Sequence, residues 1–399
     1  MKINYFAVDN FRGLSGGLKN NQIIFKDTNT IFIFGQNNTG KSTFLQAYMF
    51  FFEDTTPSKE DFYRQDTNNT ITFEIEVTVD EYDLKRIDIA APKQKDTFRK
   101  YLKNDSTLRI KKEHKNKDSE NFTLNPQTNE WEKISYGSIG LHNVFQSCMP
   151  KPIFIKAMPT EEDAKKTLNE ILKLLAEGTL KEKELEELKI AREKIKELQD
   201  KMYKPETMLK YEESVNTYFN QLFPLTNIKI KDKKDRLVWS ENKLGKDFDI
   251  EFNNTTKDGK IDEKIPTSYN SVGHGIIRTA IFTLLLMKDI AEEFERLPGR
   301  KDYIVLFEEP ELFLYPKIIQ ELRSLIYKVS EEDLPYQLLC ASHSPQMIDI
   351  SKPKSSIIRL EKTELGTFTH QINDAFLKDA KEIKTDSELR QEMYEVLRF

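Results

Sequence analysis

The sequence predicts an α/β fold built around a parallel sheet. Three apolar runs of strand length, at residues 30–34, 303–307 and 334–341, are separated by segments of helical character. Strands that are buried on both faces are near-continuous apolar runs, and parallel neighbours are connected through helices. The alternation of strand and helix therefore favours an α/β core.

Length and composition limit the class of protein. The 399 residues exceed one typical domain, and we divide them into three parts, residues 1–158, 159–223 and 224–399. Charged residues make up 32% of the chain, yet the net charge of −5 gives no global signature of a nucleic-acid-binding protein. Any DNA-binding surface must be a local patch.

Cysteine content and hydropathy indicate the compartment. Cys148 and Cys340 are too few and too far apart for a disulfide framework or a zinc site. The N-terminal residues lack the layout of a signal peptide, and no apolar run in the sequence approaches the ~18 residues of a membrane span. We expect a cytoplasmic protein with no membrane partner.

The first part of the chain is expected to be a β-rich lobe. Residues 2–9, 22–26 and 30–34 have the composition of short strands, and residues 70–79 (TITFEIEVTV) alternate between apolar and polar types. The chain then continues to about residue 155 in polar, strand-like pieces broken by Lys- and Asn-rich loops.

The middle part is expected to be a helical insert. Residues 160–204 contain no proline, one glycine and many Glu, Lys and Leu residues. Gly178-Thr179 separates two predicted helices, and Pro205 ends the second. A seam of apolar residues, spaced alternately by three and four, predicts either a helix packed on its own domain or a contact between two chains. The seam consists of Leu188, Ala191, Ile195, Leu198 and Met202.

The last part begins with charged, strand-like sequence at residues 225–265. A long apolar helix is expected to follow from about residue 275 to residue 295.

The most informative motif follows the apolar run at residues 30–34. Residues 35–42 (GQNNTGKS) fit the pattern G-x-x-x-x-G-K-S/T, and residues 43–52 have helical character. A glycine-rich loop between a strand and a helix directs backbone N–H groups and the positive end of the helix at phosphate oxygens. The motif predicts a nucleoside triphosphate site, in which Lys41 reaches the β- and γ-phosphates and Ser42 binds Mg²⁺. The residues expected to hold the nucleotide here are Gly35, Asn37, Asn38, Thr39, Gly40, Lys41, Ser42 and Thr43.

Two acids follow the second apolar run. Glu308 and Glu309 come directly after residues 303–307, where P-loop proteins handle the metal and the attacking water. We expect Glu308 to hold Mg²⁺ and Glu309 to orient or deprotonate the water.

A histidine follows the third run. His343 stands at the carboxyl end of the strand predicted over residues 337–341, the edge at which α/β sheets bind ligands. It is expected to sense the γ-phosphate through a hydrogen bond.

A second Ser/Gly turn opens the long apolar helix. Residues 267–278 (TSYNSVGHGIIR) offer backbone donors at a helix N-terminus, which also suit a phosphate. One nucleotide hardly needs two such loops from one chain. We therefore expect Ser271, Gly273 and His274 to cap the nucleotide bound by a second subunit, which makes the protein a homodimer or a higher homo-oligomer.

Together these motifs resemble ABC-type ATPase heads of the SMC-like and RecF-like group. They resemble more closely the overcoming-lysogenization-defect (OLD) family, which includes the Gabija defence ATPase. The resemblance spans nearly the whole chain and rests on the order of five short motifs, namely Asn10-Phe11-Arg12-Gly13, residues 35–42, Ser271-Val272-Gly273-His274-Gly275, Glu308-Glu309-Pro310-Glu311 and Ser342-His343-Ser344-Pro345.

The resemblance implies roles for particular residues. Arg12 helps to hold the nucleotide, Ser271 and Gly273 act in trans, and Glu309 is the catalytic glutamate. The helical stretch 160–222 occupies the position of the family's dimerisation insert, and the biological role is anti-phage defence or DNA repair.

Three positions need separate comment. The signature turn reads Ser-Val-Gly-His where transporter-type ATPases have Ser-Gly-Gly-Gln, and Tyr315 replaces the usual His. Gln65 is the candidate for the family's Q-loop glutamine.

The resemblance also concerns an effector. OLD proteins typically continue into a Toprim nuclease domain, and residues 395–399 lie close to where that domain would begin. Asp247-Phe248-Asp249 matches an Asp-x-Asp pair, but it precedes the signature turn and is expected to be structural. The chain itself is expected not to cut DNA. Three interpretations remain: the ATPase part of an OLD-type nuclease, an ATPase sensor that holds a separate effector in trans, or a RecF-like DNA clamp.

Two basic stretches are candidates for contact with DNA. One spans residues 99–117 and the other residues 229–236. Such stretches neutralise phosphates, but solvated loops have the same composition. The first stretch contains Arg99, Lys100, Lys103, Arg109, Lys111, Lys112, Lys115 and Lys117, with Tyr101 among them.

Overall fold

The structure is a computed structural model of the chain. It describes residues 1–25, 28–90, 93–115, 118–134, 142, 144–145, 149–159, 163–164, 167, 205–224, 226–232, 248–256, 258, 260–261, 273–285, 302–331, 336–349, 351–364 and 366–371. The chain divides into two compact units: Met1–Ala157, Pro298–Glu311 and Arg323–Phe399 form the first, and Met158–Leu297 and Leu312–Leu322 form the second. The division into three parts made from the sequence stays a prediction.

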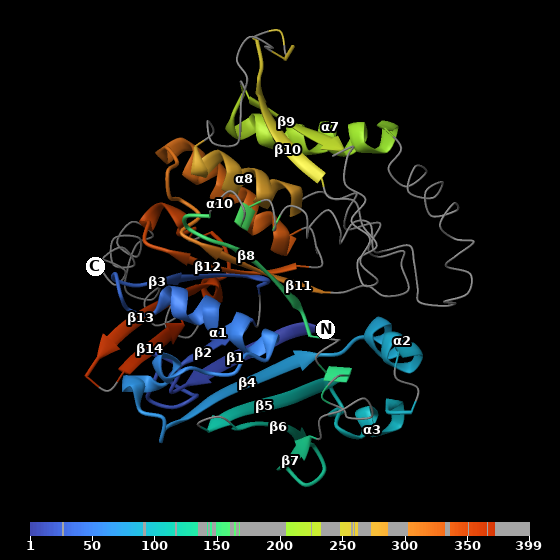
Figure 1. The fold of residues 1–399 in the computed structure, drawn as a ribbon, viewed down its shortest axis with the longest axis vertical. Coiled ribbons are helices and arrows are strands. Elements are labelled where there is room, and N and C mark those ends of the chain that lie inside the picture. Colours follow the sequence, from blue (N-terminus) through green and yellow to red (C-terminus); the bar gives the residue numbers. More distant parts are fainter. Residues whose placement is uncertain are drawn as a thin grey trace. The chain divides into compact units, whose positions relative to one another are not determined.

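The first unit contains the expected parallel sheet (Figure 1). Five of its six strands run parallel, and the sixth, β14, pairs antiparallel with β13. The α/β class predicted from the apolar runs is confirmed. In spatial order the strands are β14 (Gly366–Gln371), β13 (Ile357–Thr363), β3 (Thr30–Phe34), β12 (Tyr336–Ser342), β11 (Tyr303–Glu308) and β8 (Lys151–Ile155).

The second sheet of this unit is antiparallel and forms the expected β-rich lobe (Figure 1). Each strand pairs antiparallel with its neighbours. The strands, in spatial order, are β2 (Gln22–Ile24), β1 (Lys2–Asp9), β4 (Thr70–Thr78), β5 (Thr107–Lys115), β6 (Asp118–Asn125) and β7 (Glu130–Ile134).

Helix α1 (Lys41–Glu53) packs in the core between these two sheets (Figure 1). Ile31 and Ile33 of β3 belong to the same buried cluster as the aromatic residues of α1 and of the antiparallel sheet. The Tyr48 ring lies 5.4 Å from that of Phe6, and the Phe6 ring stacks on Phe73 at 6.2 Å. Burial of each such side chain stabilises the fold by about 2 kcal/mol. The helix that begins at the predicted phosphate loop is therefore firmly anchored.

The other face of β3 carries Phe32 and Phe34, whose rings stack 6.0 Å apart. The Phe32 ring lies 5.4 Å from that of Tyr327, which belongs to α10 (Pro316–Glu331). Thr30 Oγ1 donates to the Ile326 carbonyl at 3.3 Å. β3 is covered on both faces, as its uninterrupted apolar sequence predicts.

Helices α2 (Glu81–Ala90) and α3 (Lys95–Lys100) were not expected from the sequence, which we interpreted as strand-like here. The Asp83 N–H donates to Asp80 Oδ1 at 2.8 Å, and the Asp80 N–H donates to Asp83 Oδ2 at 3.2 Å. This reciprocal pair satisfies two backbone donors at the start of α2, as in a capping box. The prediction was wrong because a local capping pair outweighs a polar composition.

Short 3₁₀ helices connect several of these elements in the first unit. They are η1 (Lys59–Asp61), η2 (Tyr63–Gln65), η4 (Pro345–Met347) and η5 (Lys354–Ser356).

The second unit contains α7 (Pro205–Leu222), the antiparallel pair β9 (Thr226–Asp232) and β10 (Phe248–Asn254), and α8 (His274–Leu285). The Asn216 side chain joins α7 to β9, since its amide donates to the Ile228 carbonyl at 2.8 Å and its oxygen accepts from the Ile228 N–H at 2.7 Å. The strands expected in residues 225–265 are confirmed.

Pro205 begins α7. Its missing N–H costs nothing at the first helical position, where that group has no intrahelical partner. The helix that we predicted to end at this proline lies in residues 168–204, outside the described residues, so its end stays a prediction. The apolar seam from Leu188 to Met202 lies outside the described residues, so its partner stays a prediction. Asp249 lies in β10 opposite Lys231, and Asp247 is outside the described residues.

His114 is buried on the inner face of β5. Its side chain is enclosed by aromatic rings, with Phe50 at 5.6 Å and Phe73 at 6.0 Å, and neither ring nitrogen has a hydrogen-bond partner. Burial lowers the pKa of His114 to about 4, and the nearby Lys112 charge adds to this effect. His114 is therefore held neutral in the folded protein.

The free energy of unfolding is expected to fall as the pH drops from about 6.5 to about 4. In that window the unfolded chain protonates His114 and the folded protein does not, which amounts to about 3 kcal/mol at full effect. His114→Leu should flatten this part of the profile, measured by urea unfolding at several pH values. The exposed His370→Leu serves as the control, and an unchanged slope in His114→Leu would contradict the assignment.

No helix among the described residues is both long and apolar enough to cross a membrane.

Candidate nucleotide-binding site

Three loops that carry the predicted site leave the same edge of the parallel sheet. β12 lies between β3 and β11, and all three strands are parallel. Phe34 is in register with Ser342, and Glu308 with Ala341, so the loops after these strands begin at nearly the same level. Carboxyl ends of adjacent parallel strands are the usual ligand-binding edge of α/β sheets.

The phosphate loop, residues 35–42, turns tightly before α1. Thr39 Oγ1 donates to the Gln36 carbonyl at 2.9 Å. A Cβ on Gly35 would lie 2.6 Å from Thr39 Oγ1 and 3.0 Å from the Leu360 carbonyl, so a side chain there would displace the loop. Gly40 caps α1 with φ of +102°, a conformation that glycine adopts without strain. The glycines of the motif are thus required by the turn.

The remaining loop residues are arranged for contact with a ligand. Asn37 and Asn38 are exposed, Asn38 has a φ of +66°, and Ser42 and Thr43 stand half-buried in the first turn of α1. Thr39 is buried, and its carbonyl accepts a hydrogen bond from Thr367 Oγ1 of β14 at 2.9 Å.

Lys41 is buried at the start of α1, with 5% of its surface exposed. Its Nζ donates to the carbonyls of Gly35 and Gln36 at 2.7 and 2.8 Å. Burial lowers the pKa of Lys41 to about 8, although the charges of Glu309 and Glu311 oppose this shift. In the described part of the chain, the hydrogen-bond acceptors of this buried ammonium are neutral carbonyls, which makes it well suited to an anionic ligand.

ATP affinity is expected to decrease as the pH rises above about 8. We predict that Lys41 binds phosphate in its protonated form. Above the pKa that Lys41 has in the nucleotide-free protein, binding must then take up a proton, and affinity should fall by up to about tenfold per pH unit. Calorimetry from pH 7.5 to 9.5, in buffers of different ionisation enthalpy, measures both the slope and the proton uptake. An affinity independent of pH over this range would contradict the assignment.

Arg12 lies in a loop with φ of +53° and reaches two elements around the site. Its Nε donates to Asp61 Oδ1 at 3.0 Å, and its Nη1 donates to the Gln46 side chain of α1. The arrangement links Arg12 to the phosphate-loop helix. Its predicted contact with the nucleotide is not tested by these contacts and stays a prediction.

The acidic loop, Glu308-Glu309-Pro310-Glu311, and His343 lie against each other. His343 Nε2 is 3.3 Å from Glu309 Oε1, and both side chains are partly exposed. Glu309 has a φ of +44°, and its N–H donates to the Ala341 carbonyl at 2.7 Å, which fixes this unusual backbone. Glu308 Oε2 accepts from the Ala157 N–H at 3.2 Å. Two of the predicted catalytic residues, distant in sequence, are therefore brought together.

The sequence motifs gave no role to Glu311, which the structure places in this site. Its Oε1 accepts hydrogen bonds from the Ser342 hydroxyl and from the His343 and Ser344 N–H groups, at 2.8, 2.8 and 3.1 Å. The signal was available in the sequence, because Glu311 is the last acid of the Glu-Glu-Pro-Glu motif.

The second Ser/Gly turn belongs to the second unit. Ser271 lies outside the described residues, whereas Gly273 and His274 are exposed at the start of α8. The His274 ring lies 5.9 Å from that of Phe313, and Arg278 of the same helix is buried. Their predicted action on the nucleotide of a second subunit stays a prediction. Gln65, the Q-loop candidate, is exposed in η2 with φ of +56°.

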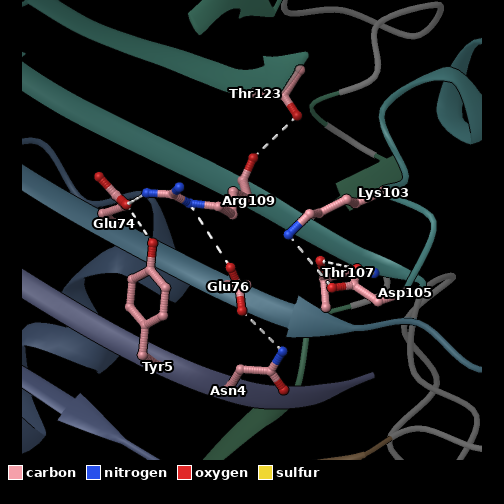
Figure 2. Close-up of polar contacts among 9 residues, drawn as sticks. All are labelled: Asn4, Tyr5, Glu74, Glu76, Lys103, Asp105, Thr107, Arg109 and Thr123. Atoms are coloured by element: carbon pink, nitrogen blue, oxygen red, sulfur yellow. Dashed lines mark hydrogen bonds and ion pairs between the residues drawn. The ribbon is translucent and has the colours of Figure 1, made fainter. Parts of the chain in front are cut away.

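The first basic stretch is largely neutralised by neighbouring acids. Figure 2 shows Arg109 between Glu74 and Glu76 of the adjacent strand β4, with Tyr5 hydrogen-bonded to Glu74. Lys111 Nζ lies 2.7 Å from Glu113 Oε1. A strand face with paired charges is a weak candidate for a DNA surface.

Lys112 is not available for DNA, because its side chain is buried. Alternate residues of β5 face inward, and Lys112 points to the end of α1, where its Nζ donates to the Phe51 carbonyl at 2.9 Å and to Asp54 Oδ1 at 2.6 Å. The composition of the stretch concealed this, since charge runs do not show which face of a strand a residue occupies. Lys117 and residues 233–236 lie outside the described residues.

The fold and the three loops define a P-loop ATPase of the ABC type, and solved structures show the same fold. An SMC head bound to the C-terminal winged-helix domain of ScpA has a TM-score of 0.57 and 14% identity, covering 96% of this chain and 100% of that one. The SMC head domain with an extended coiled coil from Pyrococcus furiosus has a TM-score of 0.54 and 15% identity, with the same coverage.

The chain belongs to the family of AAA ATPase domains, which it matches over residues 1–348. It is also similar to the Old nuclease of Escherichia phage P2, with 22% identity over 348 residues. The match covers 84% of this chain and 56% of the nuclease, so the chain spans little more than half the length of that relative. The predicted resemblance to the OLD family and to SMC heads is confirmed.

Proposed function

We propose that this ATPase binds ATP with Mg²⁺ in the site formed by the phosphate loop, the acidic loop and the His343 turn. The observation that carries the proposal is the buried Lys41 ammonium at the same sheet edge as the Glu309–His343 pair. Lys41 and the loop N–H groups would hold the phosphates, while Ser42 and Glu308 would hold the metal. When bound, Mg²⁺ neutralises charge that develops on the transferred phosphoryl group.

Within this site, Glu309 is the proposed base for the attacking water. The backbone of Glu309 is fixed by the hydrogen bond from its N–H to the Ala341 carbonyl, and His343 Nε2 lies 3.3 Å from its carboxylate oxygen. A base within reach of one water is the geometry that general base catalysis requires.

The proposal is tested by phosphate release from the purified chain with ATP and Mg²⁺. We expect slow turnover that is abolished by EDTA and restored by added Mg²⁺. Absence of phosphate release, at a protein concentration where ATP binding is saturated, would overturn the hydrolytic function. ATP hydrolysis that persists unchanged in EDTA would overturn the metal assignment alone.

We further propose that hydrolysis occurs between two copies of the chain. Residues 271–274 at the start of α8 would complete the nucleotide site of a partner subunit, and the helical stretch 160–222 would hold the dimer. The proposal is supported by the sequence of that turn and by the exposure of Gly273 and His274. Slow, switch-like turnover follows, because two chains must close before the site is complete.

We propose that this ATPase regulates a DNA-targeting nuclease in anti-phage defence, either in cis or in trans. Similarity to the Old nuclease of Escherichia phage P2 supports this class of effector. The test is the intact mass of the gene product purified from its own host, together with any protein that co-purifies. Additional C-terminal sequence would indicate an effector in cis, and a companion nuclease an effector in trans. A gene product with no additional sequence and no companion nuclease would contradict the proposal.

A further inference from the structure

Glu311 lies at the centre of a hydrogen-bond network beneath His343. One carboxylate oxygen, Oε1, accepts three hydrogen bonds from the turn that carries the histidine: from the Ser342 hydroxyl and from the N–H groups of His343 and Ser344. The Ser344 N–H also donates to Ser342 Oγ at 3.0 Å. Three donors on one charged acceptor form a tight clamp, since hydrogen bonds to a carboxylate are roughly twice as strong as neutral ones.

The other oxygen of Glu311, Oε2, is buried and has no hydrogen-bond partner among the residues that the structure describes. The contacts that Glu311 makes therefore lie on the side of the His343 turn. Because Ser342 is fully buried at the end of β12, the clamp connects a rigid strand to the loop that follows β11.

We propose that Glu311 is a positioning residue for ATP hydrolysis, which holds the His343 turn so that the imidazole lies against Glu309. This inference rests on the proposed function of the Glu309–His343 pair. The hydrogen bonds of Glu311 join the acidic loop, which carries Glu309, to the turn that carries His343. Without Glu311, the turn loses three hydrogen bonds and His343 moves relative to Glu309.

Three substitutions separate positioning from other roles. Glu311→Gln keeps a carbonyl oxygen in the place of Oε1 and can accept the same three hydrogen bonds. Glu311→Asp retains the charge but is shorter by one methylene, and Glu311→Ala removes the acceptor. A role as metal ligand or charge would be lost in the Gln variant, whereas a role as hydrogen-bond acceptor would be retained.

The expected result at pH 7 is a kcat within about fivefold of the parent for Glu311→Gln, because neutral acceptors are about half as strong. The Asp and Ala variants should lose about 100-fold in kcat with little change in KM, as expected for a displaced catalytic group. A Gln variant as inactive as the Ala variant would overturn the proposal. A parental kcat in the Ala variant would do so as well.

A second measurement does not depend on hydrolysis. Amide hydrogen exchange of His343 and Ser344 in the nucleotide-free protein should accelerate at least about tenfold in the Asp and Ala variants and little in the Gln variant. Unchanged exchange in the Asp and Ala variants would overturn the clamp. If the parent showed no ATPase activity, the proposed function would fail while exchange still decided whether the clamp exists.

Discussion

Glu309→Gln is expected to abolish ATP hydrolysis while ATP binding is retained. The amide keeps the shape of the side chain and can still bond to His343, but it cannot accept a proton from water. Loss of a general base lowers kcat by about 10²- to 10⁴-fold. The variant should also accumulate the closed dimer, because the complex forms but does not turn over.

Phosphate release, binding of a fluorescent ATP analogue and light scattering with ATP would test these three expectations together. Glu321→Gln, an exposed acid of α10, is the matched control. Glu309 has a left-handed backbone conformation, and Gln tolerates that conformation as well as Glu does because the two side chains have the same shape. The fold should therefore be unaffected. Turnover at the parental rate would remove Glu309 from its role. A monomer with ATP bound would contradict the proposed composite site.

Lys41→Ala is expected to lose nucleotide binding. The substitution removes a buried cation whose Nζ donates to the carbonyls of Gly35 and Gln36 in the phosphate loop. Deleting one partner of a buried charge pair costs about 2–5 kcal/mol, so affinity should fall by at least about 30-fold.

Calorimetric titration with ATP and Mg²⁺ measures the loss, with the exposed Lys59→Ala of η1 as the control. A thermal melt of both variants without nucleotide separates loss of binding from loss of fold. Unchanged affinity in Lys41→Ala would show that the phosphates bind elsewhere.

Much of the sheet that carries the site was predictable from the sequence. The strand expected at residues 30–34 coincides with β3. A run of Ile and Phe that is bounded by polar residues on one side and by Gly35 on the other defines both ends of the strand. Tyr303–Glu308 likewise matches the predicted run to within one residue. Buried parallel strands are the elements in which sequence and tertiary environment agree most closely.

Features that depend on pairing across the chain were not predictable. The burial of Lys112 follows from the face that β5 presents to α1, and a list of basic residues does not contain that information. The clamp made by Glu311 requires β11 and β12 to be neighbours, which is a matter of topology. Asp80 and Asp83 are visible in the sequence, but their reciprocal bonds at the start of α2 form only in the folded chain, and the polar composition around them led us to expect strand-like pieces.

Lys112 gives the phosphate-loop helix a second attachment. Just before α1 begins, the phosphate loop is joined to β14 through the hydrogen bond from Thr367 Oγ1 to the Thr39 carbonyl, and at the last turn of α1 Lys112 joins the Phe51 carbonyl to β5. Because both ends of this segment are held, we expect a shift of the phosphate loop to be passed along α1 to β5, whose opposite face carries Arg109.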